Sequence, residues 1–133
     1  MQAHTCPDRR PAGRRLRRSF YCAFQGLLEA LRHQPNLRIH LGCVAAVTAL
    51  GLWLGLSWSQ WAILVLTFVV VLGAELVNSS LEYVTDLACP EYHPLAGHAK
   101  DMSAGAVLIA ALGAVIVGLL VLGPPLVAAI GGS

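Results

Sequence analysis

The stretch W-A-I-L-V-L-T-F-V-V-V-L-G-A-E-L-V-N-S-S-L-E-Y-V-T-D, residues 61–86, decides how this chain folds. It is uncharged up to its first glutamate and then carries polar residues at i, i+3, i+4, i+7 and i+11, which share one stripe of a single helix. These residues are Glu75, Asn78, Ser79, Glu82 and Asp86. Ionisable groups at the end of an apolar membrane helix usually face a protein interior or a water-filled site, so the stripe is a functional hypothesis.

The composition around this stretch predicts a small all-α membrane protein. Of the 133 residues, 56% are hydrophobic and only 12% are charged, with a mean hydropathy of +0.66. These values exclude a soluble domain of ordinary surface chemistry. The four cysteines (Cys6, Cys22, Cys43 and Cys89) have no paired or metal-binding spacing, and we interpret them as reduced.

The N-terminal part is expected to lie on the membrane surface. Residues 1–18 are rich in arginine and poor in apolar residues, which predicts a flexible basic tail. In residues 20–32 large apolar side chains recur at helical spacing opposite polar ones, which predicts an amphipathic helix in the interface plane. Pro35 disfavours helix at Gln34 and should end this segment. The membrane domain itself is expected to cover residues 19–125, with residues 126–133 as a short C-terminal tail.

Three apolar segments follow and predict three transmembrane helices. The first covers about residues 37–57, and the second runs from Ser59, as its N-cap, to about Leu87. The second has about 28 residues and a length of about 42 Å, so its acidic end should emerge from the membrane. Residues 88–99 are expected to form a loop, and residues 101–122 the third span, ended by Gly123, Pro124 and Pro125.

Small residues recur every four positions on two of the predicted spans. Gly51 and Gly55 share a face of the first span, which is typical of close helix packing. The third span carries a longer stripe of the same kind, formed by Ala106, Ala110, Ala114 and Gly118. Another helix can approach closely along such a stripe.

The basic residues predict the orientation in the membrane. Eight of the nine are arginines that precede Ile39, and the ninth is Lys100. Because cytoplasmic loops carry an excess of Lys and Arg, the N-terminus and residues 75–101 should both be cytoplasmic. The chain is therefore expected in the plasma membrane with its polar stripe on the cytoplasmic side.

The polar groups suit metal-assisted phosphoryl transfer. Carboxylates bind hard cations such as Mg²⁺, lysine neutralises phosphate charge, and a further carboxylate can take a proton from an attacking hydroxyl. The groups concerned are Glu75, Asn78, Glu82, Asp86, Lys100 and Asp101. The alternative is a non-catalytic membrane protein, either an assembly scaffold or a proton or ion pathway around Glu75. In that case Asn78 would be interhelical glue, and Glu82 and Asp86 an ordinary solvated helix end.

Four strings carry a resemblance to a known family. They are N-L-R-I-H-L (residues 36–41), A-E-L-V-N-S-S-L-E-Y-V-T-D (74–86), P-E-Y-H-P-L-A-G-H-A-K-D (90–101) and S-A-G-A-V-L-I-A-A (103–111). In these strings, and over about residues 20–122, the chain resembles the small prokaryotic diacylglycerol kinases, a family that includes the Gram-positive-type undecaprenol kinases. The resemblance implies a membrane homotrimer that uses Mg²⁺ and ATP to phosphorylate a lipid alcohol, with no nucleic-acid partner. Undecaprenol is the expected acceptor and diacylglycerol the second choice.

The resemblance also implies roles for single residues. Glu75 would be the general base on the lipid hydroxyl, Glu82 a metal ligand, and Ala104 a neighbour of the lipid substrate. The nucleotide would be contacted by Arg15, Asn78, Asp86, Glu91, Tyr92, His93, Lys100 and Asp101. The sequence departs from the family at Gln34, where a second metal-binding glutamate is usual. An amide oxygen there can still coordinate Mg²⁺ but adds no negative charge.

Overall fold

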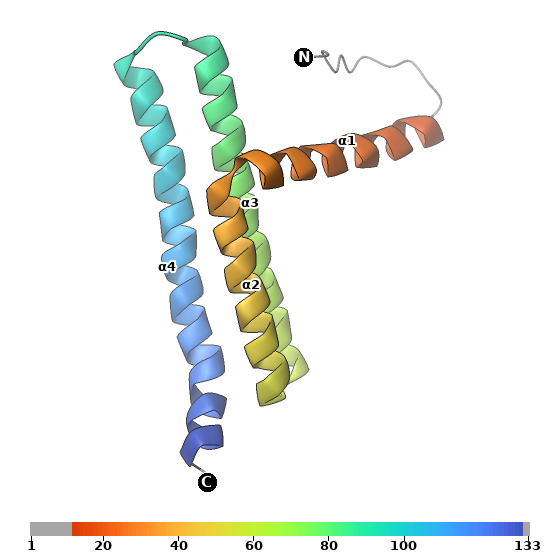
Figure 1. Cartoon of the computed structure of the whole chain (residues 1–133), viewed down its shortest axis with the longest axis vertical. Coiled ribbons are helices and arrows are strands. Elements are labelled where there is room, and N and C mark those ends of the chain that lie inside the picture. The colour runs from red at the N-terminus through yellow and green to blue at the C-terminus, as the bar shows by residue number, and fades with distance from the viewer. Residues whose placement is uncertain (1–11, 132–133) are drawn as a thin grey trace. The chain divides into compact units, whose positions relative to one another are not determined.

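The computed structural model describes residues 12–131, and they form four helices and no strand (Figure 1). In chain order these are α1 (Ala12–His33), α2 (Pro35–Leu54), α3 (Trp58–Ala88) and α4 (Pro94–Gly131). The last three are long and apolar enough to cross a membrane. The predicted all-α fold with three spans after an N-terminal helix is therefore confirmed. Two compact units are present, the first ending at His33 and the second beginning at Gln34.

Helix α1 is longer than the sequence predicted. It begins at Ala12, so residues 12–18 are helical where an irregular tail was expected, and residues 1–11 lie outside the described part. Arginine and leucine are good helix formers, which explains the extension. The side chains of Phe20 and Phe24 are 70% and 59% exposed. Such exposed aromatic residues on an amphipathic helix suit the predicted contact with a membrane surface.

The helix break predicted at Gln34 is confirmed. Gln34 has extended backbone angles (φ −104°, ψ 103°) and caps α2, and Pro35 is the first helical residue. Proline is favoured there because its missing N–H has no partner at a helix start in any case. At the other end of α2, Gly55 adopts a left-handed conformation (φ +67°) as the C-cap. Gly55 therefore ends the helix, and apart from its two chain neighbours no side chain of the described residues lies within 4 Å of a Cβ placed there.

Gly51 does serve a close approach. A Cβ atom at this position would lie 2.9 Å from Leu56 Cδ1 and 3.0 Å from the Trp61 ring. The turn after α2 and the first turns of α3 therefore fold back onto the glycine. Replacing Gly51 with a larger residue would push these side chains away.

Helix α3 starts with a capping box at Ser57, two residues before the predicted cap. The Gln60 backbone N–H donates to Ser57 Oγ, and Ser57 N–H donates to Gln60 Oε1 at 2.9 Å. Two N–H groups that have no partner inside the helix are thereby satisfied. Ser59 was predicted as the cap at the end of a short interfacial loop, but only the Ser57 and Gln60 pair has the required spacing of three.

Helix α4 differs from prediction at both ends. It begins at Pro94, so the second half of the expected loop is helical, and it continues to Gly131 through the expected stop at Pro124 and Pro125. Because Pro125 has no N–H, the carbonyl of Val121 loses its donor in the helix. The Gln60 side chain donates to that carbonyl at 3.3 Å. This contact from α3 helps α4 to tolerate the prolines.

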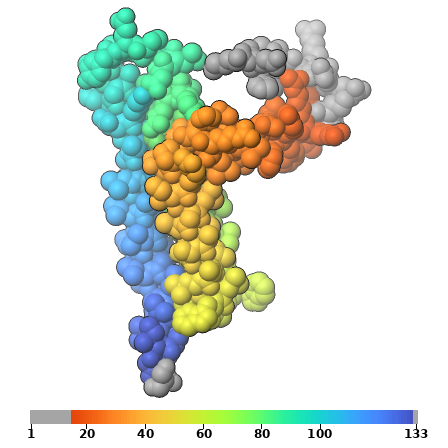
Figure 2. Space-filling model, viewed as in Figure 1, coloured from red at the N-terminus to blue at the C-terminus, as the bar shows by residue number. Residues whose placement is uncertain are grey.

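Helices α2, α3 and α4 lie side by side, and α3 and α4 run antiparallel (Figure 1). Figure 2 shows α2 directly against α4 on the visible face. The apolar core lies at the end where α2 turns into α3. Its buried members are Leu64, Val121 and Leu122, surrounded by Val47, Leu50, Leu54, Leu56, Trp61, Phe68 and Val117. The polar stripe of α3 lies toward the opposite end of the pair, near the connection to α4.

The cysteines within the described residues are free, as predicted. They are Cys22, Cys43 and Cys89, whereas Cys6 lies outside the described part.

Candidate active site

The polar stripe of α3 faces the inside of the helix bundle. Glu75, Asn78 and Ser79 are 2%, 6% and 4% exposed, and they are the buried polar or charged residues of the described part. Glu82 is half-buried, and Asp86, one turn further, is exposed. The stripe thus passes from the bundle interior to the surface along one face of α3.

Glu75 is a buried acid with no partner for its carboxylate. Its backbone carbonyl accepts a hydrogen bond from Ser79 Oγ at 2.9 Å. No side chain in residues 12–131 donates to its carboxylate oxygens. Since every fully buried side-chain oxygen or nitrogen of these residues has a partner, the unpaired oxygens of Glu75 are ones that retain some contact with the surface. They are available to a donor from outside the chain.

Asn78 connects α3 to α4 through its amide group. Asn78 Nδ2 donates to Glu82 Oε1 at 3.1 Å, and Ser103 Oγ on α4 donates to Asn78 Oδ1 at 2.6 Å. One oxygen of Glu82 is thereby occupied and the other has no hydrogen bond to a described residue. Asn78 therefore contributes to helix packing as well as to the polar stripe, so both interpretations of this residue fit the structure.

An ion pair joins α3 and α4 nearer the surface. Lys100 Nζ donates to Asp86 Oδ1, and the side chains of the two residues are 36% and 66% exposed. Such an exposed pair contributes little to stability. The ion pair holds Lys100 at the site, and because the lysine side chain is partly exposed, it remains accessible to an anion.

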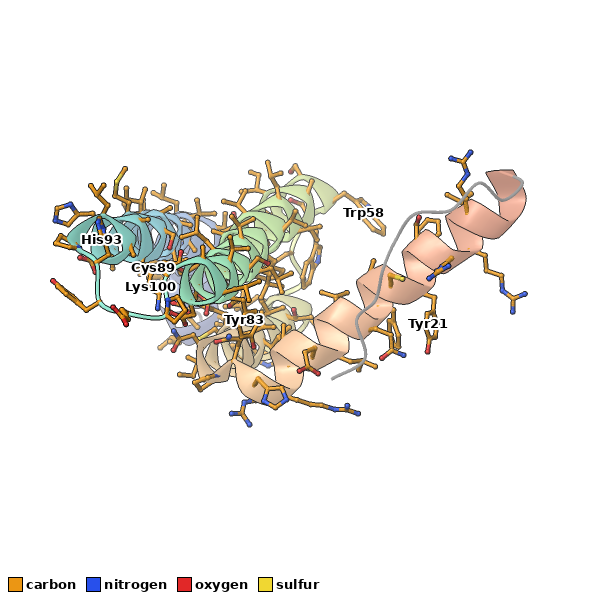
Figure 3. The ribbon with its side chains drawn as sticks, turned by 90° about the horizontal axis from the view of Figure 1, so that it is seen from above. Tyr21, Trp58, Tyr83, Cys89, His93 and Lys100 are labelled. Carbon is orange, nitrogen blue, oxygen red and sulfur yellow. The ribbon has the colours of Figure 1, made fainter. Side chains whose placement is uncertain are left out.

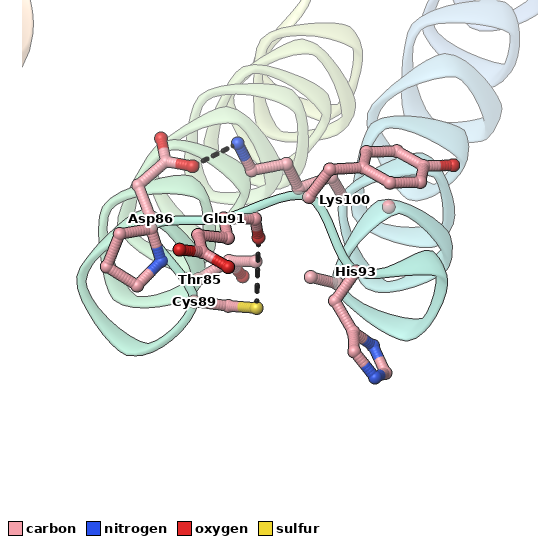
Figure 4. A pocket seen from close by; sticks show the side chains of 10 residues that line it. Thr85, Asp86, Cys89, Glu91, His93 and Lys100 are labelled. Carbon is pink, nitrogen blue, oxygen red and sulfur yellow. Dashed lines mark hydrogen bonds and ion pairs between the residues drawn. The ribbon is translucent and has the colours of Figure 1, made fainter.

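A pocket of about 300 Å³ lies beside this ion pair, where residues 89–93 connect α3 to α4 (Figure 4). Cys89, His93 and Lys100 are grouped there when the bundle is seen from above (Figure 3). The lining includes five of the predicted nucleotide-binding residues, namely Asp86, Glu91, Tyr92, His93 and Lys100. Because α4 begins at Pro94, its second turn places Lys100 in the lining of the pocket. These five residues are brought together by the α3–α4 connection.

The pocket contains its own local hydrogen bonds. Cys89 Sγ donates to the backbone carbonyl of Glu91 at 3.3 Å, and His93 Nδ1 accepts from Leu95 N–H at 3.3 Å. The Tyr92 side chain is 90% exposed and leaves its ring free for contact. The connection is therefore shaped by short-range bonds while its larger side chains stay at the surface.

The remaining predicted site residues lie apart from these contacts. Asp101 and Ala104 are exposed on α4, and neither lines the pocket. Gln34 is half-buried at the start of α2, and its side chain makes no capping hydrogen bond. Arg15 is exposed on α1, in the other compact unit. Their predicted roles remain predictions.

The donor groups suit a Mg²⁺ ion that arrives with a nucleotide. Within residues 12–131 no group of three or more His, Cys, Asp or Glu side chains is placed to hold a metal ion. Mg²⁺ usually takes only one or two carboxylates from a protein and fills its other positions with water and phosphate. Glu82, with one oxygen unoccupied, and the unbonded amide of Gln34 fit that limited demand.

Among the residues of this region that were not predicted, three have side chains that can form hydrogen bonds. Thr85 and Cys89 line the pocket, and Ser103 reaches the polar stripe from α4. Thr85 directly precedes Asp86 and Cys89 follows it by three residues, and neither carries a further signal. Ser103 lies three residues after Lys100, so the two share a face of α4, and this spacing was the available sign.

Comparison with known proteins identifies the family to which most of the chain is similar. Residues 21–122 match the family described as prokaryotic diacylglycerol kinase. The chain is 36% identical over 119 residues to an undecaprenol kinase of Bacillus subtilis, covering 90% of this chain and 97% of that protein. It is 48% identical over 110 residues to a diacylglycerol kinase of Synechocystis, covering 81% of this chain and 62% of the longer relative.

A third relative is more distant. The diacylglycerol kinase of Escherichia coli is 34% identical over 94 residues, which is 71% of this chain and 77% of that protein. The match to the family includes all of the polar stripe and the α3–α4 connection. The chain therefore belongs to the prokaryotic diacylglycerol kinase family and is a membrane-embedded lipid kinase, an enzyme that transfers phosphate to an alcohol acceptor.

Proposed function

We propose that this enzyme transfers the γ-phosphate of ATP to the primary hydroxyl of a membrane lipid, with Glu75 as the general base. The observation that carries the proposal is the buried and unpaired carboxylate of Glu75 on α3, a helix long and apolar enough to cross a membrane. Because Glu75 is shielded from bulk water, the group that gives it a proton is the hydroxyl of the acceptor lipid and not a water molecule. This favours transfer to the lipid over hydrolysis of ATP.

The atoms of the step balance as follows. Glu75 takes the proton of the lipid hydroxyl, and the hydroxyl oxygen forms a bond to the γ-phosphorus. The bond between that phosphorus and the oxygen bridging to ADP breaks, and ADP leaves. The apolar side chains around Glu75 on α3 suit the tail of the acceptor, and Ala104, exposed on α4, is small enough to let the lipid headgroup approach.

The pocket at the α3–α4 connection suits the nucleotide. Lys100 offers a positive charge to the phosphates, and its exposed pairing with Asp86 can be exchanged at small cost. The exposed ring of Tyr92 and the imidazole of His93 offer contacts to the base and ribose. The proposed nucleotide-binding set is completed by Asn78, Glu91, Asp101 and Arg15. Mg²⁺, when bound, neutralises charge on the phosphates, and the unoccupied oxygen of Glu82, together with Gln34, is proposed to hold it.

The acceptor is proposed to be undecaprenol, with diacylglycerol as the second choice. The strings N-L-R-I-H-L and H-P-L-A resemble the Gram-positive-type members, and the Bacillus subtilis undecaprenol kinase aligns over nearly its whole length. The diacylglycerol kinase of Synechocystis is more identical but aligns over a smaller share of its length. Both lipids present a primary hydroxyl and an apolar tail.

We further propose that the site is cytoplasmic and that the protein works as a homotrimer. The arginines of α1 and the sequence before it support a cytoplasmic N-terminus. Three helices with exposed apolar side chains along their length leave ample surface for partner copies or lipid.

The proposal is tested by phosphate transfer from labelled ATP in detergent micelles that contain one lipid at a time. Undecaprenol and diacylglycerol are the acceptors, and a saturated fatty alcohol controls for unspecific transfer. We expect the label to appear on undecaprenol at the higher rate. A higher rate on diacylglycerol would reverse the assignment of the acceptor, and transfer to none of the lipids would contradict the proposed reaction.

A further inference from the structure

Ser103 holds a place in the site that no prediction gave it. Its hydroxyl donates to Asn78 Oδ1 at 2.6 Å, and the other end of that amide donates to Glu82 Oε1 at 3.1 Å. A chain of two hydrogen bonds therefore runs from α4 through Asn78 to the carboxylate proposed to bind metal. Ser103 is therefore linked to this carboxylate only through Asn78.

The direction of these bonds is determined by the groups themselves. The second oxygen near the Ser103 hydroxyl is the backbone carbonyl of Lys100, at 2.9 Å, and a carbonyl only accepts. The single hydrogen of the Ser103 hydroxyl is therefore shared between this carbonyl and Asn78 Oδ1, and the contact to Asn78 is the shorter of the two. Only an amide oxygen can receive the bond to Asn78, so the amide nitrogen must point the other way, toward Glu82.

The opposite orientation of the amide would be unfavourable. Asn78 is 6% exposed, so a flipped amide would find no water to satisfy it. Its oxygen would then face the Glu82 carboxylate, and two acceptors would repel each other. The Glu82 carboxylate accepts only, so it requires the amide nitrogen, and the hydrogen from Ser103 holds the amide oxygen toward α4.

We infer that Ser103 is a positioning residue, which orients Asn78 and through it the Glu82 carboxylate for the metal of the nucleotide. The inference rests on the proposed function in one respect, the role of Glu82 as a metal ligand. Hydrogen-bonded neighbours of metal ligands commonly set the orientation of those ligands. Ser103 also couples the two helices that form the site, since it lies on α4 and acts on α3.

The test compares Ser103→Ala with Ser103→Thr and Ser80→Ala. Alanine removes the hydroxyl and is a better helix former than serine, so α4 should persist. Threonine keeps a hydroxyl. Ser80 is the matched control, because it lies exposed on α3 and its hydroxyl donates only to the Leu76 carbonyl of its own helix. Binding of Mn²⁺ in the presence of ATP is measured by electron paramagnetic resonance, and the Mg²⁺ dependence of phosphate transfer is measured in parallel.

We expect Ser103→Ala to weaken Mn²⁺ binding roughly 10-fold and to raise the Mg²⁺ concentration for half-maximal rate by a similar factor. Ser103→Thr should restore most of the loss, and Ser80→Ala should behave as the wild type. Unchanged Mn²⁺ binding in Ser103→Ala would overturn the inference, as would equal losses in the alanine and threonine variants. If the wild type phosphorylated no lipid, the proposed function would fail, whereas the Mn²⁺ comparison among the variants would still decide the role of Ser103.

Discussion

The two ends of the α3–α4 pair are held together by different kinds of contact. At the end near Trp58 the buried residues are apolar, with Leu64 of α3 packed against Val121 and Leu122 of α4. Toward the other end the buried residues are polar, and the helices are joined by Ser103 bonding to Asn78 and, nearer the surface, by an ion pair. The contact between α3 and α4 thus depends on complementary shape at the apolar end and on the direction of hydrogen bonds at the polar end.

This difference separates stability from chemistry. Lipid tails are as apolar as leucine, so the apolar end gains its stability from close packing more than from exclusion of water. The polar end gains less from packing, and its unpaired Glu75 carboxylate remains free to react. Substitutions at the apolar end should therefore lower stability more than rate, and substitutions at the polar end should do the reverse.

The largest effect is expected for Glu75→Gln. The amide keeps the size of the side chain but cannot accept the proton of the lipid hydroxyl, so the rate should fall about 10²- to 10⁴-fold, or roughly 3 to 5 kcal/mol of barrier. Expression and thermal unfolding in detergent should stay near the wild-type values. The measurement is the initial rate of phosphate transfer at saturating ATP and lipid.

Glu29→Gln is the control for that substitution. Glu29 is exposed on α1, where its Oε1 lies 3.4 Å from His33 Nε2, and its loss should change the rate little. A Glu75→Gln variant that kept more than half of the activity would make Glu75 a structural residue and remove the proposed base. The polar end would then no longer differ from the apolar end in carrying a reactive group.

The sequence predicted the polar end better than the apolar end. Helical spacing alone brought Glu75, Asn78 and Glu82 onto one stripe, because a single long helix carries them and periodicity within a helix is a local property. The spacing of Ser103 from Lys100 indicates only that the two residues share a face of α4, and the contact from Ser103 to Asn78 could not be predicted from it. This contact depends on the register between two helices, which no repeat within either helix reveals.

The errors at the helix ends have a similar origin. Pro124 and Pro125 indicate a stop when read alone, but the Gln60 side chain supplies a donor to the Val121 carbonyl from far away in the sequence. The cap at Ser57 was missed because the capping box depends on Gln60 as well as on the serine. Local rules thus fail where a residue from another helix completes the hydrogen bonds.

A smaller effect, on stability, is expected for Gly51→Ala. The added methyl group would lie 2.9 Å from Leu56 Cδ1 and 3.0 Å from the Trp61 ring, so the turn between α2 and α3 must shift. Such overpacking costs about 1 to 3 kcal/mol. Thermal unfolding in detergent should show the loss, whereas the transfer rate of the folded protein should change little.

The matched control is Gly42→Ala in the same helix. Apart from the adjoining backbone of its own helix and its two chain neighbours, nothing lies within 4 Å of a Cβ at Gly42. Alanine is also the better helix former, so this variant should be at least as stable as the wild type. Equal behaviour of the two variants would mean that Gly51 makes no close approach. A large loss of rate in folded Gly51→Ala would show that the apolar end also controls the chemistry.

The next effect concerns the bond from Gln60 to the Val121 carbonyl. Gln60→Ala should lower the free energy of unfolding by about 1 kcal/mol through loss of this bond, in addition to the loss of the capping box. In a Pro125→Ala background the helix regains a backbone N–H for that carbonyl, so the same substitution should cost less. A double-mutant cycle of thermal unfolding measures the difference. Identical costs in both backgrounds would show that Gln60 does not compensate for the proline.

The smallest expected effect, Gln34→Glu, examines how far the polar end extends beyond α3 and α4. If Gln34 joins Glu82 at the metal, a second carboxylate should lower the Mg²⁺ concentration for half-maximal rate by a few-fold, because hard cations are held chiefly by carboxylate charge. The saturated rate should change much less. Stability should be retained, since Gln34 caps α2 without a side-chain hydrogen bond and negative charge is favourable at a helix N-terminus.

Repulsion between two carboxylates in the metal-free site would act against this gain, and a Mg²⁺ titration of the rate measures the net result. Gln25→Glu supplies the matched control, because it makes the same chemical change at an exposed position of α1. It should leave the Mg²⁺ requirement as in the wild type. An unchanged or raised requirement in Gln34→Glu would mean that Gln34 does not sit at the metal. Of these two residues, Glu82 alone would then bind the metal. Metal affinity would depend more strongly on the orientation that Ser103 gives to Glu82 through Asn78.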